Sequence, residues 1–182
     1  LGMAVAGLIL MMVIASKRFD YHILRNPYIN IGFFGLCVLL MLAVHIPGVG
    51  LSTAEANRWI NLKIFSFQPS ELMKLALIML FANMMSTNHS KMNSLKYGIM
   101  PYMGILALVA GLTLLQRHLS ATIIICAIAI AMMFLGGCNL RYFVPMCIAG
   151  LAAFALVVLI LYQSGKFDYI NERIISWLFT FE

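Results

Sequence analysis

Two pairs of residues whose side chains could take part in chemistry lie close together in the stretch from Ala56 to Lys74. Arg58 is followed directly by Trp59, and Glu71 precedes Lys74 by three positions. At that spacing a carboxylate and an ammonium share one face of a helix and can form an ion pair. The functional alternative is that Lys74 presents its cation to an anionic substrate at a membrane surface. By themselves, Arg58 and Trp59 favour a headgroup anchor, because both residue types are common at membrane interfaces.

A second polar group, Gln116-Arg117-His118, lies between two apolar runs. A turn between two lipid-length runs does not need Gln, Arg and His together, so this triplet is a second candidate site. Histidine ordinarily titrates near physiological pH, which makes proton handling by His118 one hypothesis and a structural role the other. Ser120 and Thr122 are expected to hydrogen-bond to the helix backbone.

The composition places these residues in a membrane protein. Hydrophobic residues make up 63% of the chain and charged residues 10%, whereas soluble domains contain about 45–50% and about 25%. Residues 119–137 and 142–162 contain no acid or base, and each run meets the roughly 20 residues that a helix needs to cross a bilayer. Only helices or closed barrels satisfy the backbone in lipid, and these runs lack the alternation of barrel strands. The expected fold is therefore all-α, a polytopic transmembrane helical bundle.

Breaks in the apolar pattern predict about six spans within a single partial membrane domain, residues 1–182. Gln68 as a cap, Pro69 at the first helical position and Glu71 in the first turn predict the start of the third span. Residues 51–67 are expected to form a polar loop, and the aromatic residues of 163–182 suggest an interfacial helix. The predicted spans are residues 1–15, 31–47, 69–86, 97–115, 119–136 and 142–162.

The charge pattern limits the kinds of partner that the chain could bind. The net charge is +6, but the bases flank the predicted spans and are expected to lie among lipid headgroups, which argues against nucleic-acid binding. The two predicted sides of the membrane carry six Lys and Arg residues each, so counting bases leaves the orientation open. Residues 16–30, 86–96 and 138–141 carry their bases in shorter loops, which favours the cytoplasm for that side and the outside for residues 51–67.

Known sequence motifs narrow the function no further. The four cysteines lie in or at the ends of apolar runs without the spacing of metal ligands, and we interpret them as buried thiols. The chain contains no phosphate-binding loop, zinc-binding helix, esterase elbow or dinucleotide fingerprint. The residues alone therefore predict a cationic, aromatic-lined polar site on one membrane face. Such a site fits an enzyme acting on an anionic lipid, a transporter or a membrane scaffold.

Four ordered landmarks, spread over essentially the whole chain, resemble the shape, elongation, division and sporulation (SEDS) family, which includes FtsW, RodA and SpoVE. One departure is that the family usually has Pro where Arg117 stands, which leaves the local turn and the role of His118 open. The landmarks are Asp20-Tyr21 after a span, Ala56-Asn57-Arg58-Trp59-Ile60, Phe67-Gln68-Pro69-Ser70-Glu71-Leu72-Met73-Lys74-Leu75-Ala76, and Leu115-Gln116-Arg117-His118-Leu119-Ser120-Ala121-Thr122.

The resemblance implies a multi-pass peptidoglycan glycosyltransferase of the bacterial cytoplasmic membrane. Such an enzyme polymerises lipid II, an undecaprenyl-pyrophosphate-linked disaccharide peptide, at the outer face during division, elongation or sporulation, with a class B penicillin-binding protein as partner. The resemblance also implies that this fragment lacks the family's first span and C-terminal spans, so we expect it to be inactive alone. A large extracytoplasmic loop would begin at residue 163. The family's catalytic carboxylate is expected beyond Glu182, and no catalytic residue is assigned to Asp168, Glu172 or Glu182.

Joining two lipid-linked sugars requires a base for the acceptor hydroxyl and cations for the departing pyrophosphate. Arg58 and Lys74 would supply the cations or position the lipid, and Glu71 would hold Lys74. Trp59 would pack against the loop or a sugar, and Gln116 would hydrogen-bond to substrate. No cofactor and no metal-ligand set is evident, although a divalent cation on the pyrophosphate suits this chemistry. The candidate substrate-binding residues are Arg58, Trp59, Glu71, Lys74, Gln116 and His118.

Two alternatives from other classes stay open. The first is a flippase that transports a lipid-linked precursor, and the second is a non-catalytic scaffold of the division machinery.

Overall fold

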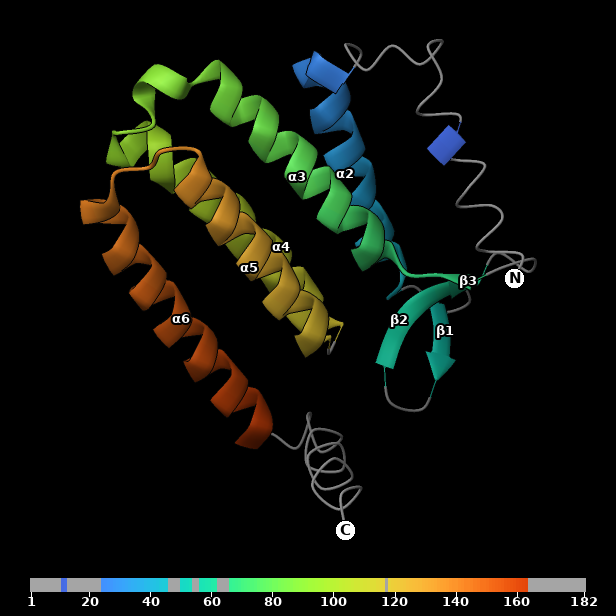
Figure 1. Ribbon diagram of the computed structural model, residues 1–182. Helices are drawn as coiled ribbons and strands as arrows, with labels where there is room; N and C mark the ends of the chain where they lie inside the picture. Colours follow the sequence, from blue (N-terminus) through green and yellow to red (C-terminus); the bar gives the residue numbers. More distant parts are fainter. Residues whose placement is uncertain are drawn as a thin grey trace.

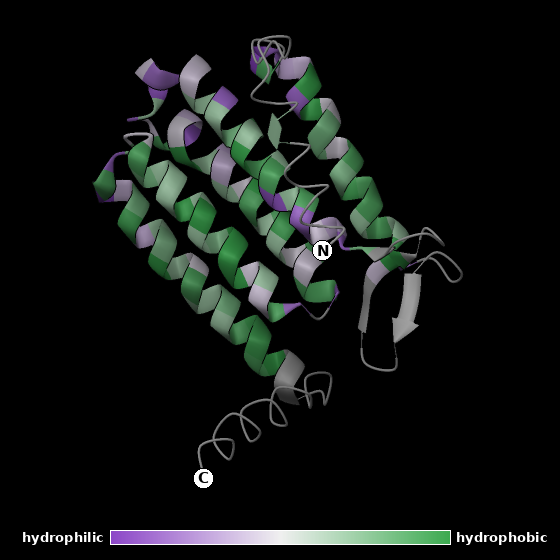
Figure 2. Cartoon of the chain, turned by 45° about the vertical axis from the view of Figure 1, so that its right-hand side comes forward, coloured by the Kyte–Doolittle hydropathy of each residue, from purple (hydrophilic) through white to green (hydrophobic). Residues whose placement is uncertain are grey.

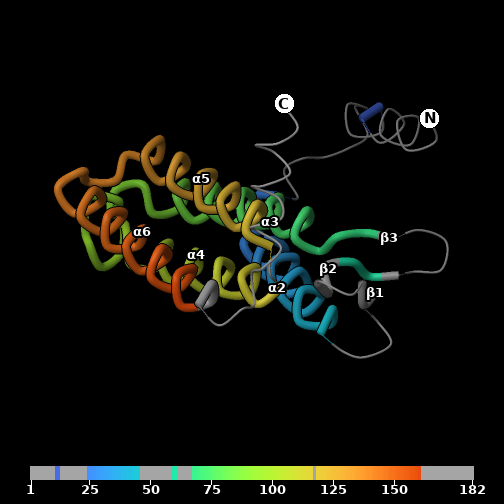
Figure 3. The backbone as a smooth tube through the Cα atoms, turned by 90° about the horizontal axis from the view of Figure 1, so that it is seen from below, coloured from blue at the N-terminus to red at the C-terminus, as the bar shows by residue number. Residues whose placement is uncertain are grey.

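The computed structural model describes residues 11–12, 24–45, 50–53, 56–61, 66–116 and 118–163. Within these residues, long helices form the body of the molecule, and a small sheet lies beside one end of it (Figure 1). The helix α3 packs against α2 and α5, α5 packs against α4, and α6 lies at the outer edge (Figures 1 and 3). The long helices are α2 (Pro27–Ala43), α3 (Pro69–Thr87), α4 (Met100–Leu115), α5 (Leu119–Leu135) and α6 (Leu140–Gln163).

Local signals explain where two of these helices begin. The helix α2 begins at Pro27 instead of near residue 31, because the Asn26 side chain accepts a hydrogen bond from the Tyr28 amide (3.0 Å) and caps the helix. The helix α3 begins at Pro69, the residue expected at its first position. Gln68 occupies the cap position there, but its side chain makes no capping hydrogen bond. The expected cap position is confirmed, but the start of α3 depends on Pro69 and on Glu71 in the first turn instead of a Gln68 side-chain bond.

The polar loop expected at residues 51–67 contains an antiparallel sheet, which corrects that expectation. Its strands are β1 (Gly50–Thr53), β2 (Ala56–Asn61) and β3 (Ser66–Phe67), in the order β1-β2-β3. Leu51 pairs with Trp59, and Ile60 pairs with Phe67. Ile60 is buried, whereas the neighbouring Trp59 is 43% exposed, as the alternating faces of a strand require.

The connection from α3 to α4 is made of short helical turns. The 3₁₀ turn η2 (His89–Lys91) follows α3, and the π-helical turn η3 (Leu95–Ile99) leads into α4. This connection lies at the end of the bundle opposite the sheet (Figure 1).

The core lies between α2, α3, α4 and α5. Met41, Phe81, Tyr102 and Ile125 are fully buried in it, and the rings of Phe81 and Tyr102 meet edge to face with centroids 5.1 Å apart. By contrast, Phe143 is the single buried side chain among residues 140–160 of α6. An apolar helix with so much outward surface is expected to contact lipid.

Hydropathy follows the same arrangement. Hydrophobic residues cover the helices, and hydrophilic residues gather at their ends (Figure 2). Among the described segments, Leu95–Leu115 and Leu140–Ile160 are long and apolar enough to cross a membrane, while α2 and α5 are apolar but shorter. The helical class agrees with the expectation. The count of six spans stays a prediction, and most of the first span, residues 1–15, lies outside the described residues.

Candidate functional site

The predicted ion pair between Glu71 and Lys74 is present at the start of α3. The Lys74 Nζ atom lies 2.7 Å from Glu71 Oε2, and the pair has the i,i+3 spacing. The Lys74 side chain is 21% exposed and that of Glu71 is 60% exposed. Glu71 also lies in the first turn of α3, where the helix dipole favours negative charge. The pair therefore holds the Lys74 ammonium near the helix start, with some of its surface open to water or a ligand.

Buried polar atoms without partners surround the start of α3. Ser70 is 0% exposed, and within the described residues its Oγ and the Nε2 of Gln68 have no hydrogen-bond partner. Burying such atoms unpaired costs about 1–3 kcal/mol each, so they commonly bind water or a ligand in native proteins. The sequence reading missed Ser70, whose signal was its place between Pro69 and Glu71 in the first helical turn.

Gln116 joins the end of α4 to the end of α2. It is 2% exposed, and its Nε2 donates a hydrogen bond to the Met41 carbonyl (2.9 Å). That carbonyl belongs to the last turn of α2, where backbone acceptors lack partners within the helix. In the described part of the chain, the Gln116 Oε1 has no partner. Gln116 thus links the end of α4 to α2, and its Oε1 atom is a buried hydrogen-bond acceptor.

His118 is the N-cap of α5. Its Nδ1 accepts a hydrogen bond from the Ala121 amide (3.0 Å), so a neutral His118 carries its proton on Nε2. Thr122 Oγ1 lies 2.9 Å from the His118 carbonyl oxygen and 2.8 Å from Thr113 Oγ1. The expected bond from Thr122 to the helix backbone is confirmed. These contacts close the turn between α4 and α5, a structural role that sequence reasoning kept as the alternative for His118.

Arg58 and Trp59 lie in β2. Trp59 is largely exposed, and β2 contacts the start of α3. The backbone of Arg58 is part of the strand, but its side chain lies outside what the structure describes, as does all of Arg117. The ends of α2 and α4 and the starts of α3 and α5 share the end of the bundle near the sheet (Figure 1). Glu71, Lys74, Gln116 and His118 are therefore brought to one end, with Trp59 in the adjoining sheet.

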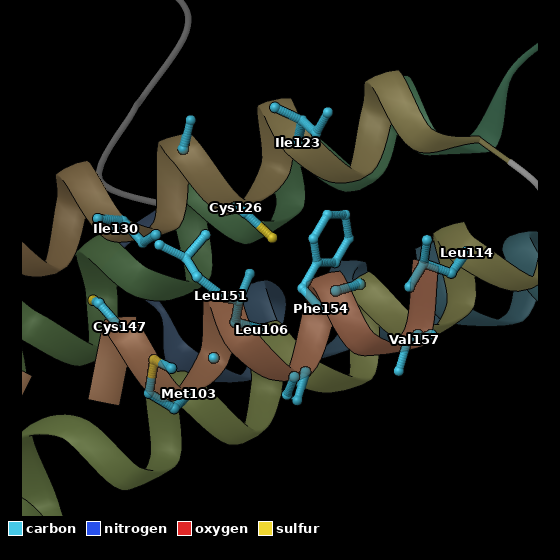
Figure 4. Close-up of a pocket in the computed structure, with 16 residues that line it drawn as sticks. Met103, Leu106, Leu114, Ile123, Cys126, Ile130, Cys147, Leu151, Phe154 and Val157 are labelled. Carbon is cyan, nitrogen blue, oxygen red and sulfur yellow. The ribbon is translucent and has the colours of Figure 1, made fainter. Parts of the chain in front are cut away.

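An apolar cavity of about 510 Å³ lies between α4, α5 and α6 (Figure 4). Phe154 of α6 points toward Cys126 and Ile123 of α5 in this view. The lining consists of alkyl, aromatic and sulfur-containing side chains, which suit hydrocarbon. The residues that line it include no Asp, Glu, His, Lys or Arg. In the described part of the chain, no three His, Cys, Asp or Glu residues gather in a way that could hold a metal ion.

Comparison with known proteins gives a consistent result. The model of the FtsW/RodA/SpoVE family, described as "Cell cycle protein", matches residues 1–182. The chain is 34% identical over 170 residues to the "Probable peptidoglycan glycosyltransferase FtsW" of Geobacter metallireducens, covering 93% of this chain and 43% of that protein. It is 32% identical over 147 residues to the "Stage V sporulation protein E" of Bacillus subtilis, covering 81% and 38%.

Solved structures show the same fold. The Thermus thermophilus rod shape determining protein RodA aligns with a TM-score of 0.59 at 24% identity, covering 83% of this chain and 46% of that one. A chain from the structure titled "Structural coordination of polymerization and crosslinking by a peptidoglycan synthase complex" aligns with a TM-score of 0.65 at 24% identity, covering 97% and 49%. The chain thus spans less than half the length of each of these relatives.

Proposed function

The chain belongs to the FtsW, RodA and SpoVE family of membrane proteins, and from that premise we propose that the protein containing it is a peptidoglycan glycosyltransferase. Its substrate is lipid II, which it polymerises at the outer face of the bacterial cytoplasmic membrane. The observation that carries this proposal is the 34% identity with an FtsW glycosyltransferase over 93% of the chain. The polar end of the bundle supports it, because an anionic lipid-linked substrate needs a cation at the membrane edge.

The reaction joins the acceptor hydroxyl of one lipid-linked sugar to the anomeric carbon of another. A base removes the hydroxyl proton, the new glycosidic bond forms, and the bond to the pyrophosphate breaks with its electron pair. Lys74 stabilises the negative charge of the leaving pyrophosphate, and Glu71 positions the ammonium at 2.7 Å before substrate arrives. Arg58 adds a second cation from β2, and Trp59 offers an exposed ring for a sugar face. The base is the catalytic carboxylate that the family resemblance implies, and it is not assigned to a residue of this chain.

Gln116 and His118 act by positioning in this proposal. Gln116 is buried and already donates to α2, so it fixes the end of α4 relative to α2. His118 fixes the start of α5 through its cap. Within the described residues, the Oγ of Ser70 and the Oε1 of Gln116 have no partner, which leaves acceptors at this end for water or substrate hydroxyls. A divalent cation, if one takes part, would bind through the pyrophosphate oxygens.

A class B penicillin-binding protein is the proposed partner. The support is that one structural relative comes from a structure titled a peptidoglycan synthase complex. Membrane association of the family also supports the placement in the cytoplasmic membrane.

The test is polymerisation of labelled lipid II by the purified full-length protein with its partner. Lys74→Ala and Arg58→Ala are expected to lower polymer formation, whereas Arg25→Ala, an exposed base at the opposite end, leaves it unchanged. Translocation of lipid II across liposomes without polymer would instead indicate a transporter. Partner recruitment that survives the loss of Arg58, Glu71 and Lys74, with no polymer from the wild type, would indicate a scaffold.

A further inference from the structure

The connection between α3 and α4 places two ammonium groups against one aromatic ring. The Nζ atoms of Lys91 and Lys96 lie 5.6 Å and 5.8 Å from the centroid of the Tyr97 ring. Both distances fall within the about 6 Å over which a cation and a ring attract each other. The two lysines are exposed, and Tyr97 is 55% exposed. We call Lys91, Lys96 and Tyr97 the Tyr97 cluster.

Buried contacts hold the Tyr97 cluster in place. Met92 is 2% exposed, and the Tyr102 hydroxyl donates a hydrogen bond to its Sδ (3.5 Å). Gly98 packs so closely on Met92 that a Cβ there would collide with the Met92 carbonyl oxygen. The Cys138 thiol donates to the Gly98 carbonyl (3.3 Å) and ties the α5–α6 connection to the same turn. The two lysines therefore project from a backbone that is packed onto the bundle.

The positive charge of the Tyr97 cluster has no carboxylate partner in the described part of the chain. Glu71 is the single acidic residue there, and it pairs with Lys74 near the opposite end of the bundle. Arg141 is exposed at the start of α6, which contacts η3, and it adds to the excess. A soluble surface of this charge would normally carry compensating acids.

The surroundings place the Tyr97 cluster at headgroup depth. Lys96 and Tyr97 lie at the very start of the apolar segment Leu95–Leu115, which is long enough to cross a membrane, and Lys91 precedes it. Exposed apolar side chains lie around it, including Leu95, Met100 and Leu140. Bases and tyrosines next to exposed apolar side chains are typical of the membrane interface, where an anionic leaflet attracts each base. Binding of an acidic soluble protein would not account for the exposed apolar side chains beside the cluster.

We propose that the Tyr97 cluster is a binding site for the phosphate group of an anionic phospholipid, at the end of the bundle opposite the sheet and the start of α3. The two ammonium groups contact the phosphate oxygens, and the Tyr97 hydroxyl donates a hydrogen bond to them. The acyl chains lie along the exposed apolar residues of α4 and α6. This site is independent of the polymerisation proposed above.

The test measures phospholipid binding to the full-length protein by native mass spectrometry in detergent, titrating phosphatidylglycerol against phosphatidylcholine. Phosphatidylglycerol is expected to bind preferentially to the wild type. Lys91→Gln and Lys96→Gln are each expected to weaken its binding by about tenfold, the typical effect of losing one charge-assisted hydrogen bond to a bound phosphate. Arg25→Gln removes the same charge from an exposed position at the same end, without a ring contact among the described residues, and should leave binding unchanged.

Two further variants distinguish a specific binding site from nonspecific attraction by positive charge. Tyr97→Leu keeps both lysines but removes the ring that holds them, and it should weaken phosphatidylglycerol binding. Lys74→Met should strongly lower polymerisation while leaving this binding intact, so the two proposals can fail separately. Equal losses from Arg25→Gln and Lys91→Gln would overturn the proposal, since the charge would then act without a site. Equal binding of the two lipids by the wild type would overturn it as well.

Discussion

Replacing Lys74 with Met separates the two roles that its ion pair could have. Methionine keeps most of the length and volume of the side chain but removes the ammonium that lies 2.7 Å from Glu71. Because Glu71 is 60% exposed, water screens the pair, and its loss should destabilise the fold by only about 0.2–1 kcal/mol. For a chain of this size that corresponds to a lowering of Tm by at most about 4 °C. A purely structural ion pair therefore predicts a small change in stability and no change in chemistry.

The proposed role predicts a much larger effect on catalysis. Removing one group that stabilises charge developing in a transition state typically lowers kcat by about 10²–10³-fold. We expect Lys74→Met to lower lipid II polymerisation by about that factor, while tryptophan fluorescence reports near-normal thermal unfolding. Arg25→Met is the matched control, because it removes an exposed base from the opposite end. A Lys74→Met protein that polymerises at the wild-type rate would refute the reasoning.

Three further predictions concern buried contacts within the helical bundle. Gln116→Ala leaves a carbonyl in the last turn of α2 without its donor, which should cost about 1–3 kcal/mol; an unchanged Tm would contradict the link. Gly98→Ala should collide with the backbone of Met92, whereas Gly104→Ala meets nothing within 4 Å, so folded yield should fall for the first variant alone. Burial raises the pKa of the Cys138 thiol, so less thiolate exists at neutral pH. In a variant whose other three cysteines are serine, maleimide should label Cys138 slowly until sodium dodecyl sulfate unfolds the protein. Rapid labelling of the native state would show that the thiol is exposed.

Local physics made parts of α3 predictable from sequence. Pro69 has no amide hydrogen to lose at the first helical position, and Glu71 and Lys74 meet through a spacing that any helix imposes. The start of α2 also depends on a local signal, the Asn26 cap before Pro27, but the predicted start near residue 31 did not take it into account. Its Asn-Pro pair is a cap signal of the same kind.

Other parts depend on contacts between segments that are distant in sequence. The sheet pairs Leu51 with Trp59. Strands of four and six residues are too short for their register to be predicted from the sequence pattern. The bond of Gln116 to α2 joins residues 75 positions apart, so its burial could not be read from its turn. Ser70 was passed over for the same reason, because its burial depends on what packs against the start of α3.

The most direct test of the central claim is to supply purified full-length protein and its partner with labelled lipid II and to separate the products by size. The proposed function predicts a ladder of glycan polymers with release of undecaprenyl pyrophosphate, and loss of the ladder in Lys74→Met. Labelled lipid II that stays monomeric with the wild-type complex, or a full ladder from Lys74→Met, would contradict it.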